Sequence, residues 1–209
     1  MARWKLLLVE GPDDEHVVKN LCGRRLGPWL DEIVAQKGVD ELLEAIRPRV
    51  LASAGEHIIG IVLDADTDLH RRWQQITGRL AASGYRDLPL RPDSAGTIIE
   101  PKLESTLPRF GIWIMPDNQR TGALEDFLRP SSTRLFEHVE TSVAAIPPDE
   151  VKFSTPARPK VLLHTYLAWQ AVPGNPFGTA IKRGDLRSDT PEVDAFITWL
   201  QRLYSEVSA

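Results

Sequence analysis

The stretch KLLLVEGPDDE, residues 5–15, joins an apolar run of strand character to a cluster of acids. Trp4–Val9 is short and nearly continuously apolar, which predicts a strand buried on both faces of a sheet. Gly11 and Pro12 end this strand, and proline suits the first turn of the helix that the following residues predict. A strand and helix alone do not require Glu10, so the acids call for a separate explanation.

A second stretch, HIIGIVLDADTD at residues 57–68, repeats the pattern of an apolar run followed by acids. His57–Leu63 predicts another buried strand, after which Asp64 and Asp66 follow. In open α/β sheets, ligands bind outside the carboxyl ends of the strands. We therefore expect Glu10, Asp64 and Asp66 to meet at that edge. Residues two apart in extended chain face the same side, so Asp64 and Asp66 are expected to do so.

Three carboxylates at one edge repel one another, by roughly 4 kcal/mol per pair at ~4 Å in an effective dielectric near 20. Either their pKa values rise or a cation lies among them. Oxygen ligands without histidine or cysteine suit Mg²⁺ or Mn²⁺ better than zinc. Asp14, four residues after Glu10, is a further candidate ligand, which leaves a two-metal arrangement open. The alternative for Asp14 is that acids in a first turn only complement the helix dipole.

Strand and helix patterns alternate through the first 130 residues. The predicted strands are 4–9, 31–36, 57–63, 97–100 and 110–115, and the predicted helices between them include 39–51 and 69–83. This alternation predicts an α/β fold with a mainly parallel sheet flanked by helices. The later pattern is helical at 124–128, 132–145, 158–170 and 191–207, with a loop rich in glycine and proline at 171–190. We therefore divide the chain into an α/β domain of residues 1–130 and a helical C-terminal extension of residues 131–209, packed on it as one structural unit.

Composition bounds the classes of function. The chain has 209 residues, a net charge of −4 and a sequence pI near 5.8, which argues against a continuous basic surface for nucleic acid. Cys22 is the single cysteine, so neither an intrachain disulfide nor a thiolate zinc cluster is expected. The N-terminal apolar run is shorter than the roughly 7–15 residues of a signal peptide, and no apolar segment reaches the roughly 18 residues of a membrane span. We expect a cytoplasmic protein without membrane contact.

Four further residues are candidates for the site. Lys182 is a candidate to contact a scissile phosphate, with Arg183 as a secondary candidate, because residues 152–187 hold six Lys or Arg and one acid. The alternative is a basic surface loop. Asp117 follows the predicted strand at 110–115 and Glu125 lies on the next helix, so both are secondary candidates at the same edge. Turn formation after Pro116 explains Asp117 equally well.

The quoted stretches resemble the motifs of Toprim domains. LLLVEGPDDEHVV is similar to their first motif, a strand ending in Glu-Gly, and IIGIVLDADTD to their second, a strand running into Asp-x-Asp. The segment GIWIMPDNQRTGALEDFL resembles a small stand-alone bacterial Toprim-like group of unknown function. This group is related to the Toprim domains of nucleases of the overcoming-lysogenization-defect (OLD) type. The resemblance covers residues 4–130 as the Toprim part, and only loosely the remainder.

The resemblance implies a Toprim-like, Rossmann-like fold with a Mg²⁺ site. It implies Asp64 and Asp66 as metal ligands, Glu10 as general acid/base or metal ligand, and Asp14 as the further acid of OLD-type nucleases. We therefore expect Mg²⁺- or Mn²⁺-dependent phosphodiester hydrolysis on DNA or RNA, with Glu10 and Lys182 as catalytic residues.

Two alternatives remain open. The first is a hydrolase of nucleotides or small phosphate esters, and the second is a non-catalytic module that binds a metal or a protein partner. The sequence contains no Gly-x-x-x-x-Gly-Lys-Ser/Thr motif, unlike OLD proteins with their ATPase, and no tyrosine module of the topoisomerase kind. Any activity would therefore come from the Toprim-like unit, alone or with a partner.

Overall fold

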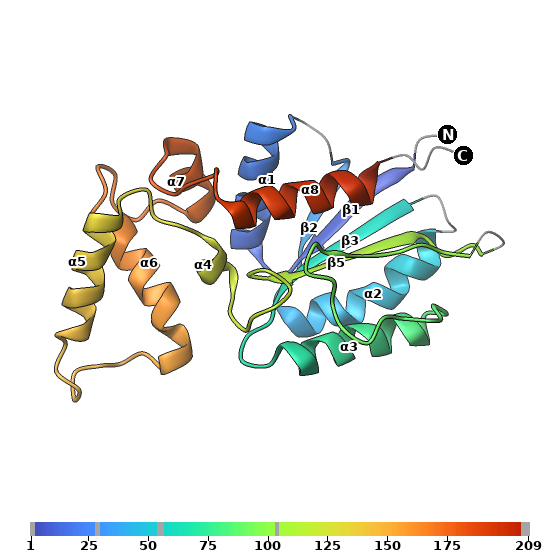
Figure 1. The fold of residues 1–209 in the computed structure, drawn as a ribbon, viewed down its shortest axis with the longest axis horizontal. Coiled ribbons are helices and arrows are strands. Elements are labelled where there is room, and N and C mark those ends of the chain that lie inside the picture. The colour runs from blue at the N-terminus through green and yellow to red at the C-terminus, as the bar shows by residue number, and fades with distance from the viewer. Residues whose placement is uncertain (1–2, 28–29, 54–56, 103–104, 206–209) are drawn as a thin grey trace.

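The computed structural model describes residues 3–27, 30–53, 57–102 and 105–205 and shows one sheet with helices on both faces (Figure 1). The strands are β1 (Trp4–Val9), β2 (Glu32–Ala35), β3 (His57–Asp64), β4 (Thr97–Ile99) and β5 (Arg109–Met115). Their order is β2-β1-β3-β5-β4, in which only β4 runs antiparallel to its neighbour. The prediction of an α/β fold with a mainly parallel sheet is confirmed.

Alternate residues of each central strand serve opposite faces of the sheet. Leu6 and Leu8 of β1 pack with α2 (Val39–Ser53) and α3 (Leu69–Ala82) on one face. Leu7 and Val9 face the other side, which α1 (Pro12–Arg25) and α8 (Pro191–Tyr204) cover (Figure 1). Both faces are buried, which explains the nearly continuous apolar runs of β1, β3 and β5.

The remaining helices follow β5. They are α4 (Leu124–Phe127), α5 (Thr133–Ala144), α6 (Arg158–Ala168), which begins directly after a 3-10 turn at Thr155–Ala157, and α7 (Phe177–Arg183). Figure 1 shows α5 and α6 side by side at one end of the molecule, beyond the carboxyl ends of the parallel strands. Within the described residues, no helix combines the length and the apolar character needed to cross a membrane.

The C-terminal helix α8 lies against the sheet at two glycines. A Cβ on Gly60 would lie 2.6 Å from Tyr204 Oη, and one on Gly111 would lie 2.3 Å from Leu203 Cδ2. Tyr204 Oη donates a hydrogen bond of 2.7 Å to the carbonyl of Leu6. Residues near the end of the chain therefore complete the core of the sheet that the first strand begins.

The helix α7 differs from the sequence prediction, which made residues 171–190 a loop. Two glycines in this segment, Gly178 and Gly184, allow the helix to pack closely and to end. Gly178 allows close approach to α1, because a Cβ there would lie 2.5 Å from the carbonyl oxygen of His16. Gly184 ends the helix in the left-handed region, at φ 87°. The predicted helix at 191–207 is α8, which ends at Tyr204, and residues 206 and 207 lie outside the described residues.

The close approach of α8 predicts the effect of adding a methyl group to the sheet. We expect Gly111→Ala to lower the free energy of unfolding by about 1–3 kcal/mol, because Leu203 must move to make room. Urea denaturation measures this change. Gly23→Ala is the matched control, since a Cβ at this helical position meets no atom within 4 Å and a gain of about 0.5–1 kcal/mol is expected. Equal effects of the two substitutions would contradict the packing argument.

Candidate functional site

The neighbouring strands β1 and β3 bring Glu10 and Asp64 into contact at the carboxyl edge of the sheet. Trp4–Val9 pair in parallel with His57–Val62; Glu10 directly follows β1, and Asp64 is the last residue of β3. Glu10 Oε2 accepts a hydrogen bond of 3.2 Å from the backbone N–H of Asp64. Two acids that lie 54 residues apart in the sequence are thus fixed side by side by strand pairing.

Asp14 joins them from the first turn of α1. Its side chain accepts a hydrogen bond of 3.0 Å from the backbone N–H of Gly11 through Oδ2. The residue is 7% exposed, yet its Oδ1 has no hydrogen-bond partner among the described residues, and the same holds for the buried Oδ1 of Asp64. Buried polar atoms are rarely left unpaired, so these two oxygens require an explanation.

Glu125 of α4 is the fourth acid of the group, which we call the carboxylate cluster: Glu10, Asp14, Asp64 and Glu125. Its side chain is only 11% exposed, and its Oε1 lies 3.8 Å from Nζ of Lys160 on α6. The charge of Glu125 contributes to raising the pKa of each of the other three cluster members. The secondary candidate Glu125 therefore lies within electrostatic range of the strand-end acids.

The pKa values in the cluster are raised by burial and by mutual repulsion. Burial, followed by the charge of Glu10, raises the pKa of Asp14 to about 7. Burial and the charges of Asp14 and Glu10 raise the pKa of Asp64 well above its usual value. The pKa of Glu10 is also raised, mainly by burial, although the hydrogen bond from Asp64 opposes this. The cluster therefore favours either bound protons or a bound cation.

Asp66 pairs with an arginine, unlike the buried and unpaired Oδ1 atoms of Asp14 and Asp64. Its φ is 53°, so the backbone leaves the extended conformation on which the expectation of a shared side for Asp64 and Asp66 depended. Arg72 of α3 holds the turn: its Nε–H donates to the carbonyl of Asp64 at 2.8 Å, and its Nη2 pairs with Asp66 Oδ2 at 2.5 Å. Asp66 is therefore paired with Arg72 on α3, while its charge still contributes to raising the pKa values of Glu10 and Asp64.

The turn at Asp66 also fixes the loop that carries Glu125. Asp66 and Gly122 exchange two backbone hydrogen bonds, of 2.9 and 2.8 Å. Gly122 has φ 140°, and a Cβ there would lie 2.8 Å from Asp126 Oδ2, so the position requires glycine. Gly122 is visible in the sequence just before α4, but the sequence does not show that it pairs with Asp66.

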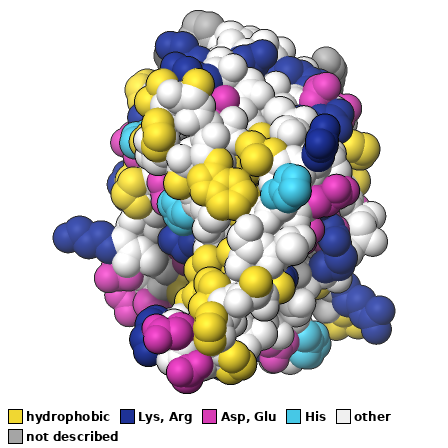
Figure 2. All heavy atoms as spheres, turned by 90° about the vertical axis from the view of Figure 1, so that its left-hand side faces the viewer, with side chains coloured by type: hydrophobic (Ala, Val, Ile, Leu, Met, Phe, Trp, Pro, Cys, Tyr) yellow, Lys and Arg dark blue, Asp and Glu magenta, His cyan; other side chains and the backbone are white. Residues whose placement is uncertain are grey.

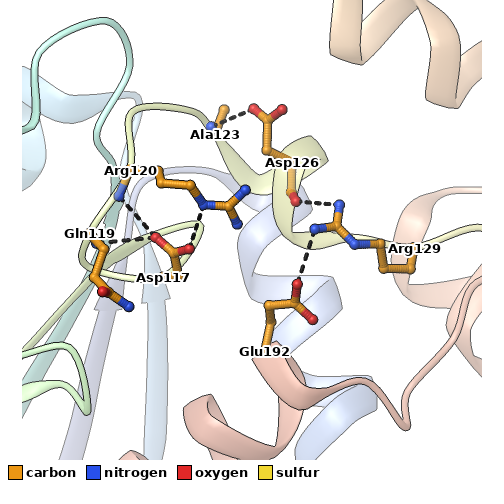
Figure 3. A network of polar contacts seen from close by, with 7 residues as sticks. All are labelled: Asp117, Gln119, Arg120, Ala123, Asp126, Arg129 and Glu192. Carbon is orange, nitrogen blue, oxygen red and sulfur yellow. Dashed lines mark hydrogen bonds and ion pairs between the residues drawn. The ribbon is translucent and has the colours of Figure 1, made fainter.

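Asp117 serves the loop after β5 rather than the cluster (Figure 3). Its Oδ1 accepts hydrogen bonds from the backbone N–H groups of Gln119 and Arg120, and its Oδ2 pairs with Nε of Arg120 at 2.6 Å. Partial burial alone would raise the pKa of Asp117, but the hydrogen bonds from Arg120 and Gln119 outweigh it and lower the pKa. Turn formation, the alternative weighed from the sequence, accounts for all of these contacts.

Lys182 and Arg183 lie at the opposite end of α1 from Asp14. The carbonyl of Lys182 accepts a hydrogen bond of 3.2 Å from Arg24, ten residues beyond Asp14, which is about 15 Å along the helix axis. Arg183 lies 3.6 Å from Asp185. The structure therefore does not bring Lys182 to the cluster. The lysine placed there is Lys160, which the sequence showed only as one member of the basic excess in residues 152–187.

Among the described residues, no three His, Cys, Asp or Glu side chains are positioned to hold one metal ion. A site built from this cluster would therefore draw on two carboxylates at most without side-chain movement. The two unpaired oxygens, Asp14 Oδ1 and Asp64 Oδ1, are the natural donors, and both are hard oxygen ligands.

Together these features define an α/β protein of a type compatible with a Rossmann-like fold, with a buried carboxylate cluster at the carboxyl edge of its sheet. The chain belongs to the family described as "Protein of unknown function (DUF3226)", whose model matches residues 4–205. No curated protein and no solved structure matches the chain significantly. The family match includes α8 as well as the sheet, so it covers every residue of the cluster.

The raised pKa of Asp14 makes the free energy of unfolding depend on pH. The pKa lies near 7 in the folded chain against 3.8 normally, so the contribution of protonated Asp14 is complete below pH 3.8 and is lost as the pH rises through about 7. We expect Asp14→Asn to stabilise the protein by about 2–4 kcal/mol at pH 8, and by much less at pH 4. Urea denaturation in EDTA at the two pH values measures this difference, and a pH-independent effect would contradict it.

Proposed function

We propose that this protein is a divalent-metal-dependent phosphodiesterase of the Toprim-like kind that acts on nucleic acid at the carboxylate cluster. The observation that carries the proposal is the pair of buried carboxylate oxygens without partners, Asp14 Oδ1 and Asp64 Oδ1, beside Glu10. The order β2-β1-β3 places the ends of β1 and β3 side by side, which is what the Toprim resemblance requires and therefore supports it. We propose the cytoplasm as the location of the protein, in keeping with the expectation from the sequence.

The donor set fits Mg²⁺ or Mn²⁺. Mg²⁺ is usually bound through one or two carboxylates, with waters and substrate phosphates completing its coordination. Asp14 and Asp64 supply two such carboxylates, and Glu10 lies next to Asp64. When bound, the ion would neutralise charge on the phosphate and lower the pKa of a coordinated water. The absence of a complete three-residue ligand set does not oppose this, because the substrate itself contributes ligands.

The remaining side chains have roles that their positions define. Glu10 is held by the backbone N–H of Asp64 through Oε2, and its pKa, raised by burial, suits a group that takes up and releases a proton. Lys160 lies 3.8 Å from Glu125, with its side chain 57% exposed, so its ammonium can meet a phosphate that approaches the cluster. We therefore assign to Lys160 the phosphate contact that the sequence suggested for Lys182.

The proposal predicts which carboxylates are needed for activity. We expect Asp64→Asn and Glu10→Gln to lower Mn²⁺-dependent cleavage of single-stranded DNA or RNA by about 100-fold or more, because each removes a group at the reacting phosphate. Asp117→Asn is the matched control, since Asp117 holds a turn outside the cluster, and we expect its activity to be close to that of the wild type. Cleavage of labelled oligonucleotides with Mg²⁺ or Mn²⁺ measures this. Failure of the wild-type protein to cleave with either ion would refute the proposal.

A second comparison tests the assignment of the cation. We expect Lys160→Ala to reduce kcat/KM by about 10-fold, because a charge-assisted contact to phosphate is lost. Lys182 is exposed and lies in α7, next to the end of α1 that is far from the cluster, so Lys182→Ala should leave kcat/KM unchanged. The reverse order of effects would return the role to Lys182.

A further inference from the structure

A pocket of about 660 Å³ adjoins the carboxylate cluster. Its walls come from the segment 125–140, the start of α6 and the start of α8, and they include Glu125. Glu125 thus lines the pocket while its charge acts on Asp14 and Asp64. A molecule in this pocket would lie beside Glu125, the member of the cluster that lines the pocket.

The pocket wall combines apolar side chains with charged ones, and within the described part of the chain it includes an arginine whose guanidinium has no partner. Phe136, Leu162 and Leu163 contribute apolar surface, and Phe136 is steadied by an edge-to-face contact with Tyr166 at 6.0 Å between ring centroids. Arg158 also lines the pocket, and among the described residues no hydrogen bond or ion pair occupies its guanidinium. A planar guanidinium beside an aromatic ring is the combination that proteins use to stack an unpaired base.

Several other charged groups in the wall are already engaged, as Figure 3 shows for Asp126, Arg129 and Glu192, whereas the side chain of Glu140 has no ion pair or hydrogen bond among the described residues. Arg129 donates to the carbonyl of Asp126 at 2.7 Å and pairs with Glu192 at 3.0 Å. The carboxylate of Asp126 accepts the N–H of Ala123 at 2.9 Å. Arg187 pairs with Asp189. Arg158 is therefore the arginine of the wall that is available to a ligand.

Size and surface charge favour one nucleotide over a duplex. Pockets of roughly 300–1,000 Å³ hold single small ligands, and 660 Å³ lies within that range. Figure 2 shows the face at the α5 and α6 end, where Lys and Arg side chains are interspersed with Asp and Glu. A duplex held along its backbone needs a basic track instead, because its affinity comes from phosphate neutralisation.

We propose that this pocket binds the base and sugar of one unpaired nucleotide, stacked on Arg158 and Phe136, whose phosphate then lies on the carboxylate cluster. This inference rests on the proposed function and names its substrate class. The nucleotide is either a free nucleotide or the unpaired end of a strand. Both ligands present the same base and sugar to the pocket. They differ because a strand end is joined to further nucleotides outside the pocket.

The test is binding of the fluorescent nucleoside 1,N6-ethenoadenosine in EDTA, measured by anisotropy, because the base and sugar occupy the pocket without needing a metal at the carboxylate cluster. EDTA separates this measurement from metal-dependent cleavage. We expect Arg158→Ala to raise the Kd of the probe by about 10-fold or more, because a stacked charged contact is lost. Thr155→Trp, at an exposed position in the pocket wall, should weaken binding similarly by filling the pocket without altering the core. Arg134→Ala, on the exposed surface of α5 outside the pocket, is the matched control and should bind as the wild type does.

Competition distinguishes the two sources. Displacement of the probe by a short single-stranded oligonucleotide at lower concentration than by AMP supports a strand end, and equal displacement supports a free nucleotide. Unchanged binding in both Arg158→Ala and Thr155→Trp, or no binding by the wild type, would overturn the inference. The proposed function would stand in that case if Asp64→Asn still abolished cleavage, so the two failures are distinguishable.

Discussion

The parallel pairing of β1 with β3 sets the constraint on which the rest of this structure depends. It holds Glu10 against the backbone of Asp64, and α1 then adds Asp14 from a helix that must start directly after β1. Charges this close repel by several kcal/mol at the dielectric of a partly buried site. The chain cannot relieve this by moving the side chains apart, because their positions follow from strand register. The repulsion can then be lowered only by protonation of the carboxylates or by a bound cation. The raised pKa values of Asp14 and Asp64 show the tendency toward protonation.

The sequence was informative where one physical signal dominated. Continuous apolar runs located β1, β3 and β5 within one residue of their observed bounds, because burial on both faces leaves no other composition. Once the ends of β1 and β3 were located, Glu10 and Asp64 could be predicted to meet at the carboxyl edge of the sheet. The pairing of Asp66 with Arg72 could not be foreseen, because it depends on a left-handed backbone angle and on the position of α3, neither of which a two-residue period encodes. Lys160 was missed since its position depends on how α6 packs against α4.

Glycine explains much of the remaining difference between sequence and structure. Sequence patterns treat glycine as a breaker of helices, and residues 171–190 were expected to be a loop on that ground. In the structure, Gly178 admits α1 to close contact, just as Gly60 and Gly111 admit α8 to the sheet. A glycine needed for close approach and one needed for a turn look identical in a single sequence. Only the partner surface distinguishes them, and that surface comes from a segment far away in the chain.

The short helix α4 shows why the site depends on the C-terminal part of the chain. Leu124 and Phe127, three residues apart, face the core, where Phe127 meets Phe196 of α8 with ring centroids 5.8 Å apart. With that face buried, Glu125 is left on another side of the single turn, where its charge reaches Asp14 and Asp64. Removing α8 would therefore release Glu125 as well as uncover the sheet. The first part of the chain supplies Glu10, Asp14 and Asp64 to the candidate site. The C-terminal helices fix the position of Glu125 and form the walls of the pocket beside it.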